Sequence, residues 1–258
     1  GEDCVVPGTP KTPWYVAMGG GRSWVSDNGS SWTLGNPSIQ VTYDNGSVET
    51  FHSKDLAFAN SEFLAVGYSQ PGGSIAVRSN DGVNWTLAGR VDNSSNQSAE
   101  AVAYGTGKYV AMGSSRSWVS DNVSSWSLGN PNIQATLDNG SVVTFQAKDL
   151  VFANNEFLAV GGGLLGGGTL ANTALRSSDG VNWSFAGRLD NSTNQTAEAV
   201  AFGMVDPQVV DNWTLDNSTA DNSNDLIVSF TSPTDNQSSV SVSASISVTF
   251  SKATDSTS

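Results

Sequence analysis

Apolar and polar residues alternate along this chain in short runs that end at Gly, Asn or Asp. Alternation of period two over a few residues is typical of half-buried β-strands, and turn residues at both ends fix where each strand stops. Two sets of four runs recur: the first is Ala101–Gly105, Lys108–Gly113, Ser117–Ser120 and Ser125–Leu128, and the second is Leu56–Ala59, Phe63–Gly67, Ile75–Ser79 and Asn84–Leu87. The pattern predicts an all-β fold with short strands in groups of four.

Most of these runs occur twice. Arg22–Asn28 returns as Arg116–Asn122, 94 residues later, and Arg78–Trp85 returns as Arg176–Trp183, 98 residues later, after a Gly-rich insertion at 161–170. Four-stranded units of ~40–50 residues are typical of propeller blades. The duplication therefore predicts a small β-propeller at 14–205, built from two tandem repeats of two blades each.

The turn before the last strand of each unit carries a motif. In Ser79–Trp85, Asp can hydrogen-bond its own turn, Gly can adopt a positive φ, and Trp can anchor the next strand in the core. The residues to which we assign these structural roles are Trp32, Asp81, Gly82, Trp85, Trp126, Asp179, Gly180 and Trp183.

This turn resembles the Asp-box, or BNR, repeat (Ser-X-Asp-X-Gly-X-X-Trp) of sialidases and of many non-catalytic bacterial propellers. The copies here are one residue shorter between Asp and Gly, and two carry Asn28 or Asn122 where Asp is expected. The resemblance covers residues 14 to about 203. It implies a β-propeller and leaves the activity open.

The first unit lacks the opening strand that Ala101–Gly105 provides in the third unit, and a copy of that strand, Ala199–Gly203, follows the fourth unit. We therefore predict that Ala199–Gly203 pairs with Tyr15–Met18 and closes a four-bladed ring by strand exchange between the termini, because unpaired strand edges invite aggregation. Asn45-Gly46 and Asn139-Gly140 predict two hairpins that interrupt the blade pattern.

The repeat stops after Gly203. We interpret 1–13 as an N-terminal segment, 206–224 as a linker and 225–258 as partial Ig-like β-sandwich strands, since Ile246–Phe250 and the preceding Ser-Pro-X-Asp turn resemble the start of a bacterial Ig-like domain. Such a sandwich needs about 100 residues. Either the domain is cut short, or its strands complete the sheet of a partner subunit.

Charge and composition narrow the function classes. The net charge is −13 and only 14% of residues are charged, against roughly 25% in typical domains. An acidic chain of this kind argues against nucleic acid and anionic membranes as partners. Cys4 is the single cysteine, so it forms no internal disulfide and is a free thiol, an intermolecular bridge or a lone exposed residue.

Thirteen of the 23 asparagines lie in Asn-X-Ser/Thr sequons, which predicts an extracellular or cell-surface glycoprotein. The alternative is that Asn-Gly and Asn-Ser serve as turn residues. The candidate acceptors are Asn28, Asn45, Asn84, Asn93, Asn96, Asn122, Asn139, Asn182, Asn191, Asn194, Asn212, Asn217 and Asn236.

Candidate catalytic residues are mostly duplicated, and a residue copied with its repeat usually serves the fold. This holds for the arginine pairs Arg22/Arg116, Arg78/Arg176 and Arg90/Arg188 and for the glutamate pairs Glu62/Glu156 and Glu100/Glu198. A sialidase would use three convergent arginines, a Tyr/Glu nucleophile pair and an acid/base Asp. His52 is the only histidine, which argues against a Ser-His triad or a histidine metal site.

No cofactor is expected, although the turns Asp92–Asn96 and Asp190–Asn194 could offer oxygen ligands to Ca²⁺. Our main interpretation is a non-catalytic extracellular structural or adhesive module, in which 225–258 contacts a partner subunit of a surface or filamentous assembly. The alternative is a glycan-binding, lectin-like or divergent sialidase-like propeller in which Trp14, Trp24 or Trp118 stacks on a sugar ring.

Overall fold

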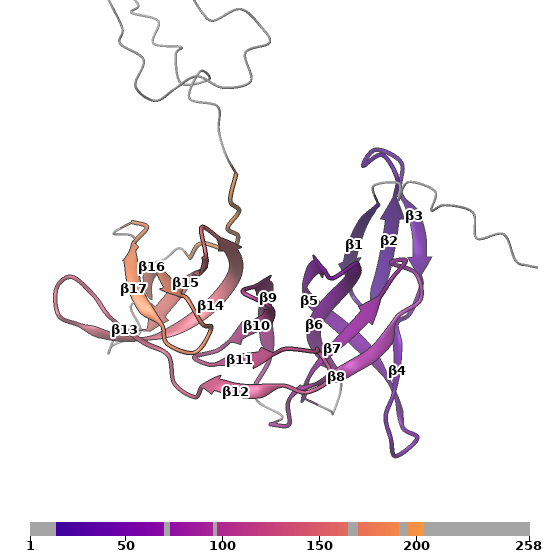
Figure 1. Cartoon of the computed structure of the whole chain (residues 1–258), viewed down its shortest axis with the longest axis horizontal. Coiled ribbons are helices and arrows are strands. Elements are labelled where there is room, and N and C mark those ends of the chain that lie inside the picture. Colours follow the sequence, from indigo (N-terminus) through magenta and orange to yellow (C-terminus); the bar gives the residue numbers. More distant parts are fainter. Residues whose placement is uncertain (1–13, 70–72, 95–96, 165–169, 191–195, 204–258) are drawn as a thin grey trace, which may run out of the picture. The chain divides into compact units, whose positions relative to one another are not determined.

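The computed structural model describes residues 14–69, 73–94, 97–164, 170–190 and 196–203 (Figure 1). Internal contacts divide the chain into two units, 1–204 and 205–258. The described residues therefore all belong to the first unit. The predicted N-terminal segment with Cys4, the linker at 206–224 and the Ig-like strands at 225–258 lie outside them.

The described residues form an all-β fold without helices, in four antiparallel sheets that follow one another along the sequence. Sheet I has the order β1-β2-β3, sheet II β4-β5-β6-β7-β8, sheet III β12-β11-β10-β9 and sheet IV β13-β14-β15-β16-β17. The strands are β1 (Tyr15–Gly19), β2 (Arg22–Ser26), β3 (Thr33–Asn36), β4 (Gln40–Thr42), β5 (Val48–Ala59), β6 (Glu62–Ser69), β7 (Gly73–Ser79), β8 (Thr86–Asp92), β9 (Ala99–Gly105), β10 (Lys108–Gly113), β11 (Ser117–Ser120), β12 (Ser127–Asn130), β13 (Gln134–Thr136), β14 (Val142–Ala153), β15 (Glu156–Leu164), β16 (Leu170–Ser177) and β17 (Ser184–Arg188).

The two halves of the duplication have the same strand registers. Tyr15 lies opposite Ser26 in sheet I, and its copy Tyr109 lies opposite Ser120 in sheet III. Both Asn-Gly hairpins form, with Gly46 at φ +80°. They do not interrupt the sheets as we expected, because β5 and β14 run without a break from the hairpin into sheets II and IV and bend only at a bulge.

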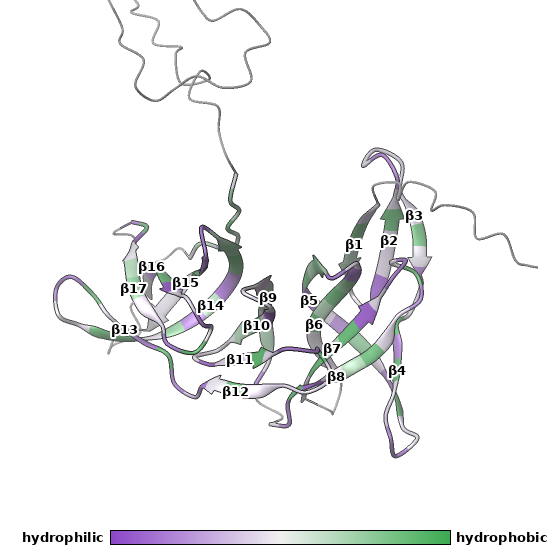
Figure 2. Ribbon diagram, viewed as in Figure 1, coloured by the Kyte–Doolittle hydropathy of each residue, from purple (hydrophilic) through white to green (hydrophobic). Residues whose placement is uncertain are grey.

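Three apolar clusters join consecutive sheets. The I/II cluster is centred on Phe51, Ile75 and Trp85. The II/III cluster contains Tyr109 and Trp118, and the III/IV cluster contains further large buried side chains such as Phe145. Figure 2 shows the apolar residues along strands such as β6 and β10, between more polar turns. Each sheet thus packs against the sheet or sheets next to it in the sequence.

The predicted strand exchange between the termini is not formed. Residues 196–203 are described, but they are not in a strand, and among the described strands β1 pairs only with β2. Sheet I consequently has three strands rather than four. The prediction was wrong because sequence similarity to β9 identifies a segment that can form a strand, but does not say which edge it reaches.

Sheets II and IV are each tethered by one aspartate to the segment that follows the sheet. In the bulge of β5, Asp55 accepts the backbone N–H groups of Leu56 and, across to β9, of Val102, both at 2.7 Å. Asp149 repeats this at 2.7 Å to Leu150 and to Val200. Burial raises the pKa of Asp55 to about 6, against the opposing effect of its two backbone hydrogen bonds.

Because the folded-state pKa of Asp55 lies above its usual value of 3.8, the folded protein binds more protons than the unfolded chain between about pH 4 and pH 6. The free energy of unfolding should therefore fall as pH rises through this window, by up to about 3 kcal/mol from this group. Urea unfolding at pH 4, 5, 6 and 7 measures it. Asp55→Asn should flatten this slope, whereas Asp44→Asn, at an exposed hairpin position, should leave it unchanged.

Candidate functional site

The turn at Ser79–Trp85 is held closed by its own side chains. The Ser79 hydroxyl accepts the N–H of Gly82 at 2.8 Å, and Asp81 Oδ1 accepts the N–H groups of Val83 and Asn84 at 2.9 and 2.8 Å. Asp81 Oδ2 accepts the Asn84 side-chain amide at 2.8 Å. Partial burial would raise the pKa of Asp81, but these hydrogen bonds outweigh it and lower the pKa to about 2. Asp81 is therefore a permanently ionised part of the turn.

The other copies use the same geometry. Asp179 accepts the N–H groups of Val181 and Asn182, each at 2.8 Å, and its pKa is likewise lowered to about 2 by such bonds, against the effect of burial. In the degenerate copies Asn28 and Asn122 accept the corresponding N–H groups through Oδ1. An amide oxygen thus replaces the carboxylate without changing the turn.

The motif tryptophans differ in burial. Trp85 is 7% exposed, and its indole N–H lies 3.0 Å from the Gly82 carbonyl and 3.3 Å from the Ser23 hydroxyl of sheet I. Trp126 and Trp183 are half-buried, whereas Trp32 is 44% exposed. Our prediction of a core position was therefore wrong for Trp32. Trp85, Trp126 and Trp183 each pack in or against one of the three apolar clusters between sheets, whereas Trp32 belongs to none of them.

Gly82 is the point where the turn meets sheet I. Its φ is +73°, and a Cβ atom there would lie 2.5 Å from Val16 Cγ2. Its carbonyl accepts the hydroxyl of Ser23 at 2.7 Å. Gly180 repeats this contact against Val110 in sheet III. The positive φ favours glycine, although Val123 adopts φ +60° at the equivalent position of the third copy. At Gly82 and Gly180 it is the close approach to a valine that excludes a larger residue.

A polar pocket of about 440 Å³ opens beside this turn, within the usual size range for small-ligand sites of about 300–1,000 Å³. It is lined by Glu62, Arg78, Ser79, Asn80, Asp81, Asn84 and Thr86. Trp14 is not one of these lining residues, but its indole N–H donates to the backbone carbonyl of Asp81, which is one, at 3.0 Å, while 44% of Trp14 stays exposed. An exposed indole is therefore attached to the turn that lines the pocket.

The second repeat keeps the polar groups and lacks the indole. Glu156, Arg176, Asp179 and Asn182 take the sequence positions of Glu62, Arg78, Asp81 and Asn84. Lys108 stands at the position of Trp14. The two copies of the site are thus chemically different.

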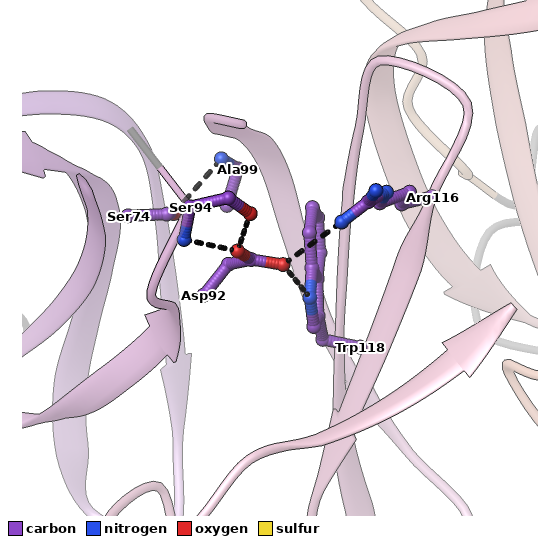
Figure 3. Close-up of polar contacts among 6 residues, drawn as sticks. All are labelled: Ser74, Asp92, Ser94, Ala99, Arg116 and Trp118. Carbon is purple, nitrogen blue, oxygen red and sulfur yellow. Dashed lines mark hydrogen bonds and ion pairs between the residues drawn. The ribbon is translucent and has the colours of Figure 1, made fainter. Parts of the chain in front are cut away.

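Two further arginine candidates, Arg116 and Arg90, have structural contacts. Arg116 forms an ion pair with Asp92 at 3.4 Å, and the same carboxylate accepts the indole N–H of Trp118 at 2.9 Å (Figure 3). Arg90 lies over the ring of Tyr43, 4.4 Å from its centre. Trp118 is 1% exposed, so our proposal of sugar stacking at this residue was wrong. Trp24 is half-buried.

Among the glutamate candidates, some form ion pairs and one lines the pocket. Glu100 pairs with Lys54 at 2.9 Å and Glu198 with Lys148 at 3.4 Å, while Glu62 lines the pocket. His52 stacks on Tyr68. Within the described residues no three His, Cys, Asp or Glu side chains are grouped as metal ligands. Asp92, considered for Ca²⁺, is engaged by Ser94, Arg116 and Trp118 (Figure 3).

Seven of the candidate glycosylation sites are described, and all are exposed; they are Asn28, Asn45, Asn84, Asn93, Asn122, Asn139 and Asn182. Asn96, Asn191, Asn194, Asn212, Asn217 and Asn236 lie outside the described residues. Over the part of the chain that the structure describes, no helix is long and apolar enough to cross a membrane.

No protein-family model matches this sequence, and no curated protein is significantly similar to it. Similar solved structures include a β-fructofuranosidase of Bombyx mori (12% identity, TM-score 0.41, covering 57% of this chain and 38% of that one). They also include an α-L-arabinofuranosidase of Clostridium thermocellum (12%, 0.40, 67% and 64%) and YCF48 bound to a peptide (13%, 0.31, 69% and 73%). The chain spans less than two thirds of either enzyme.

These similarities agree with an all-β, propeller-type fold. Several of the similar structures are glycoside hydrolases, which contradicts our interpretation of a non-catalytic structural or adhesive subunit. At 12% identity the similarity concerns the fold. Substrate and activity therefore have to be argued from this chain's own residues.

Gly82→Ala should destabilise the protein more than Gly46→Ala. Both positions have a positive φ, but a Cβ at Gly46 meets nothing within 4 Å, whereas one at Gly82 meets Val16. Backbone strain costs about 1–2 kcal/mol at either site, and overpacking adds about 1–3 kcal/mol at Gly82 alone. Urea midpoints of the two variants measure the difference. Equal losses of stability would show that this contact does not constrain the joint between sheets I and II.

Proposed function

We propose that this chain is a glycan-binding propeller, with sheets I–IV as its blades, and that it binds a neutral sugar at the pocket beside Trp14. The observation that carries the proposal is the exposed indole of Trp14, bonded to the carbonyl of Asp81, a residue that lines a mainly polar pocket. Sugars combine an apolar ring face with a rim of hydroxyl groups. Such a ligand needs both an aromatic platform and hydrogen-bonding groups.

The polar groups of the pocket match hydroxyl recognition. Glu62 accepts hydrogen bonds, Arg78 donates them, and Asn80 does both. Two carboxylates, Glu62 and Asp81, stand against the one guanidinium of Arg78. This balance disfavours an anionic sugar, and it supports a neutral ligand.

The ionised state of Asp81 favours binding of a sugar over hydrolysis of a glycoside. A glycosidase uses one carboxyl group as a general acid and a second as nucleophile or base. Asp81 is held ionised by Val83 and Asn84, with a pKa of about 2, and so has no proton to give near neutral pH. Both oxygens of Asp81 are also engaged by groups of its own turn, so Glu62 has no free second carboxylate among the residues that line the pocket.

An extracellular or cell-surface location belongs to the same proposal. The exposed sequons, Asn45 and Asn139 among them, support glycosylation of a secreted chain. Intact mass before and after enzymatic deglycosylation measures how many of them carry sugar.

Trp14→Ala should weaken glycan binding by about tenfold or more, because it removes the ring on which the sugar stacks. Trp14→Phe keeps a ring without the indole N–H and should retain most of the affinity. A glycan array with the full chain identifies ligands, and titration calorimetry with the strongest ligand measures the dissociation constants.

Trp32→Ala is the matched control, since Trp32 is also 44% exposed and also bonds a turn carbonyl, but that carbonyl belongs to Gly29, which does not line the pocket. Its affinity should stay within about twofold of the wild type. An array without ligands would contradict the proposal, and so would equal losses in the two alanine variants. If the protein cleaves fluorogenic glycosides and Glu62→Gln abolishes this activity, hydrolysis at the same site would replace binding as the proposed function.

A further inference from the structure

The II/III interface shows how one sheet of this chain packs against the sheet that precedes it. Strand β9 pairs with β10, with Ala103 opposite Val110 and Tyr104 opposite Tyr109. Its Val102 N–H is bonded by Asp55 of sheet II, and Val91 from β8 is 4% exposed in the cluster beneath. The interface thus consists of one shared strand, one aspartate tether and one apolar cluster.

The chain carries both halves of a further interface of this kind, and they do not meet. At one end of the repeat, Leu189 takes the sequence position of Val91 but is 48% exposed. At the other end, Tyr15 takes the position of Tyr109, which is 2% exposed, yet Tyr15 is 50% exposed. Phe202, like Leu189 and Tyr15, is exposed.

Residues 197–203 are already held in position to act as a first strand. Asp149 bonds the N–H of Val200 at 2.7 Å, as Asp55 bonds Val102. Asn172 bonds the N–H of Ala197 at 3.0 Å, as Ser74 bonds Ala99. The segment therefore has the two backbone anchors of β9 and lacks a β10 to pair with.

The edge of β1 is the matching acceptor. Among the described strands β1 has no partner beyond β2, which leaves backbone N–H and C=O groups available for a further strand. Phe58 beside it is 62% exposed. Its copy Phe152 packs directly on Gly105, the last residue of β9. Gly203 is the corresponding residue of 197–203 and could cover Phe58 in the same way.

Residues of the polar contact in the II/III interface also recur in the duplicated sequence. In the II/III interface the Asp92 carboxylate binds Trp118 and Arg116, as Figure 3 shows. Trp24 and Arg22 of sheet I take the positions of Trp118 and Arg116. Sheet I therefore carries the same two donor groups as sheet III.

We propose that residues 197–203 of one copy of this chain add to β1 of a second copy, forming the missing first strand of its sheet I in the register of β9 on β10. The two faces of such an interface are different, so the contact is head to tail. It gives a closed ring if the rotation between copies closes, and an open filament if it does not.

Disulfide trapping tests the register in a Cys4→Ser background. Ala201 and Val16 correspond to Ala103 and Val110, which are directly opposite, at the separation of about 4.5–5.5 Å that a disulfide can bridge. Full-length Ala201→Cys and Val16→Cys proteins, mixed and oxidised, should give a disulfide-linked dimer on non-reducing gels. The control replaces Ala201→Cys by Ala186→Cys, at an exposed position of β17, and should give none above background.

A chain that carries both cysteines distinguishes a second copy from the chain's own edge. We expect a ladder of disulfide-linked multimers. A monomer locked by an internal disulfide would overturn the proposal in favour of pairing within one chain, and absence of cross-linking in the mixture would overturn it outright.

Mass measurement by light scattering gives a readout that needs no disulfide. The average mass of the wild-type particles should increase with protein concentration. Leu189→Asp should weaken association by about tenfold or more, because it places a charge in the apolar contact. Leu128→Asp, at a leucine that is 50% exposed on β12, should behave as wild type. A monomer at every concentration, or equal effects of the two aspartates, would contradict the proposal.

Discussion

The buried hydroxyl of Ser23 is a hydrogen-bonding centre between sheets I and II. It donates to the carbonyl of Gly82 at 2.7 Å and accepts the N–H of Asn36 at 3.1 Å and the indole N–H of Trp85 at 3.3 Å. A buried hydroxyl with all its partners is stable, whereas the loss of one leaves an unpaired polar group in the core. The position of the turn, and with it the pocket at Asp81, depends on this contact.

Two kinds of joint alternate along the chain. Sheets I and II, and again III and IV, meet through a turn glycine and a buried serine, Gly82 with Ser23 and Gly180 with Ser117. Sheets II and III meet instead through β9 and the tether of Asp55. Because the sequence is a duplication of two-sheet units, an interface of the second kind is encoded after sheet IV as well. The anchored but unpaired segment at 197–203 follows directly from this arrangement.

Local chemistry could be predicted from the sequence, whereas contacts between distant residues could not. The hydrogen bonds of Asp81 and the positive φ of Gly82 involve residues within one turn, so the motif alone predicts them. Trp85 and Trp32 occupy equivalent motif positions but differ in burial, because burial depends on the sheet next to each ring. Trp14 was a candidate for sugar stacking, but its contact with Asp81, 67 residues away, required the fold.

The duplication also separates residues that serve the fold from those available for function. Asp81 and Asp179 have their oxygens engaged within their own turns, so neither is free to act on a ligand as a proton donor. Glu62 and Arg78 are exposed to the pocket, but both are repeated as Glu156 and Arg176. Between the copies, Lys108 replaces Trp14, and Ser178 replaces Asn80 of the pocket. An indole and an ammonium group cannot offer the same surface to a sugar ring. The proposed sugar binding therefore depends on a side chain that the second repeat lacks.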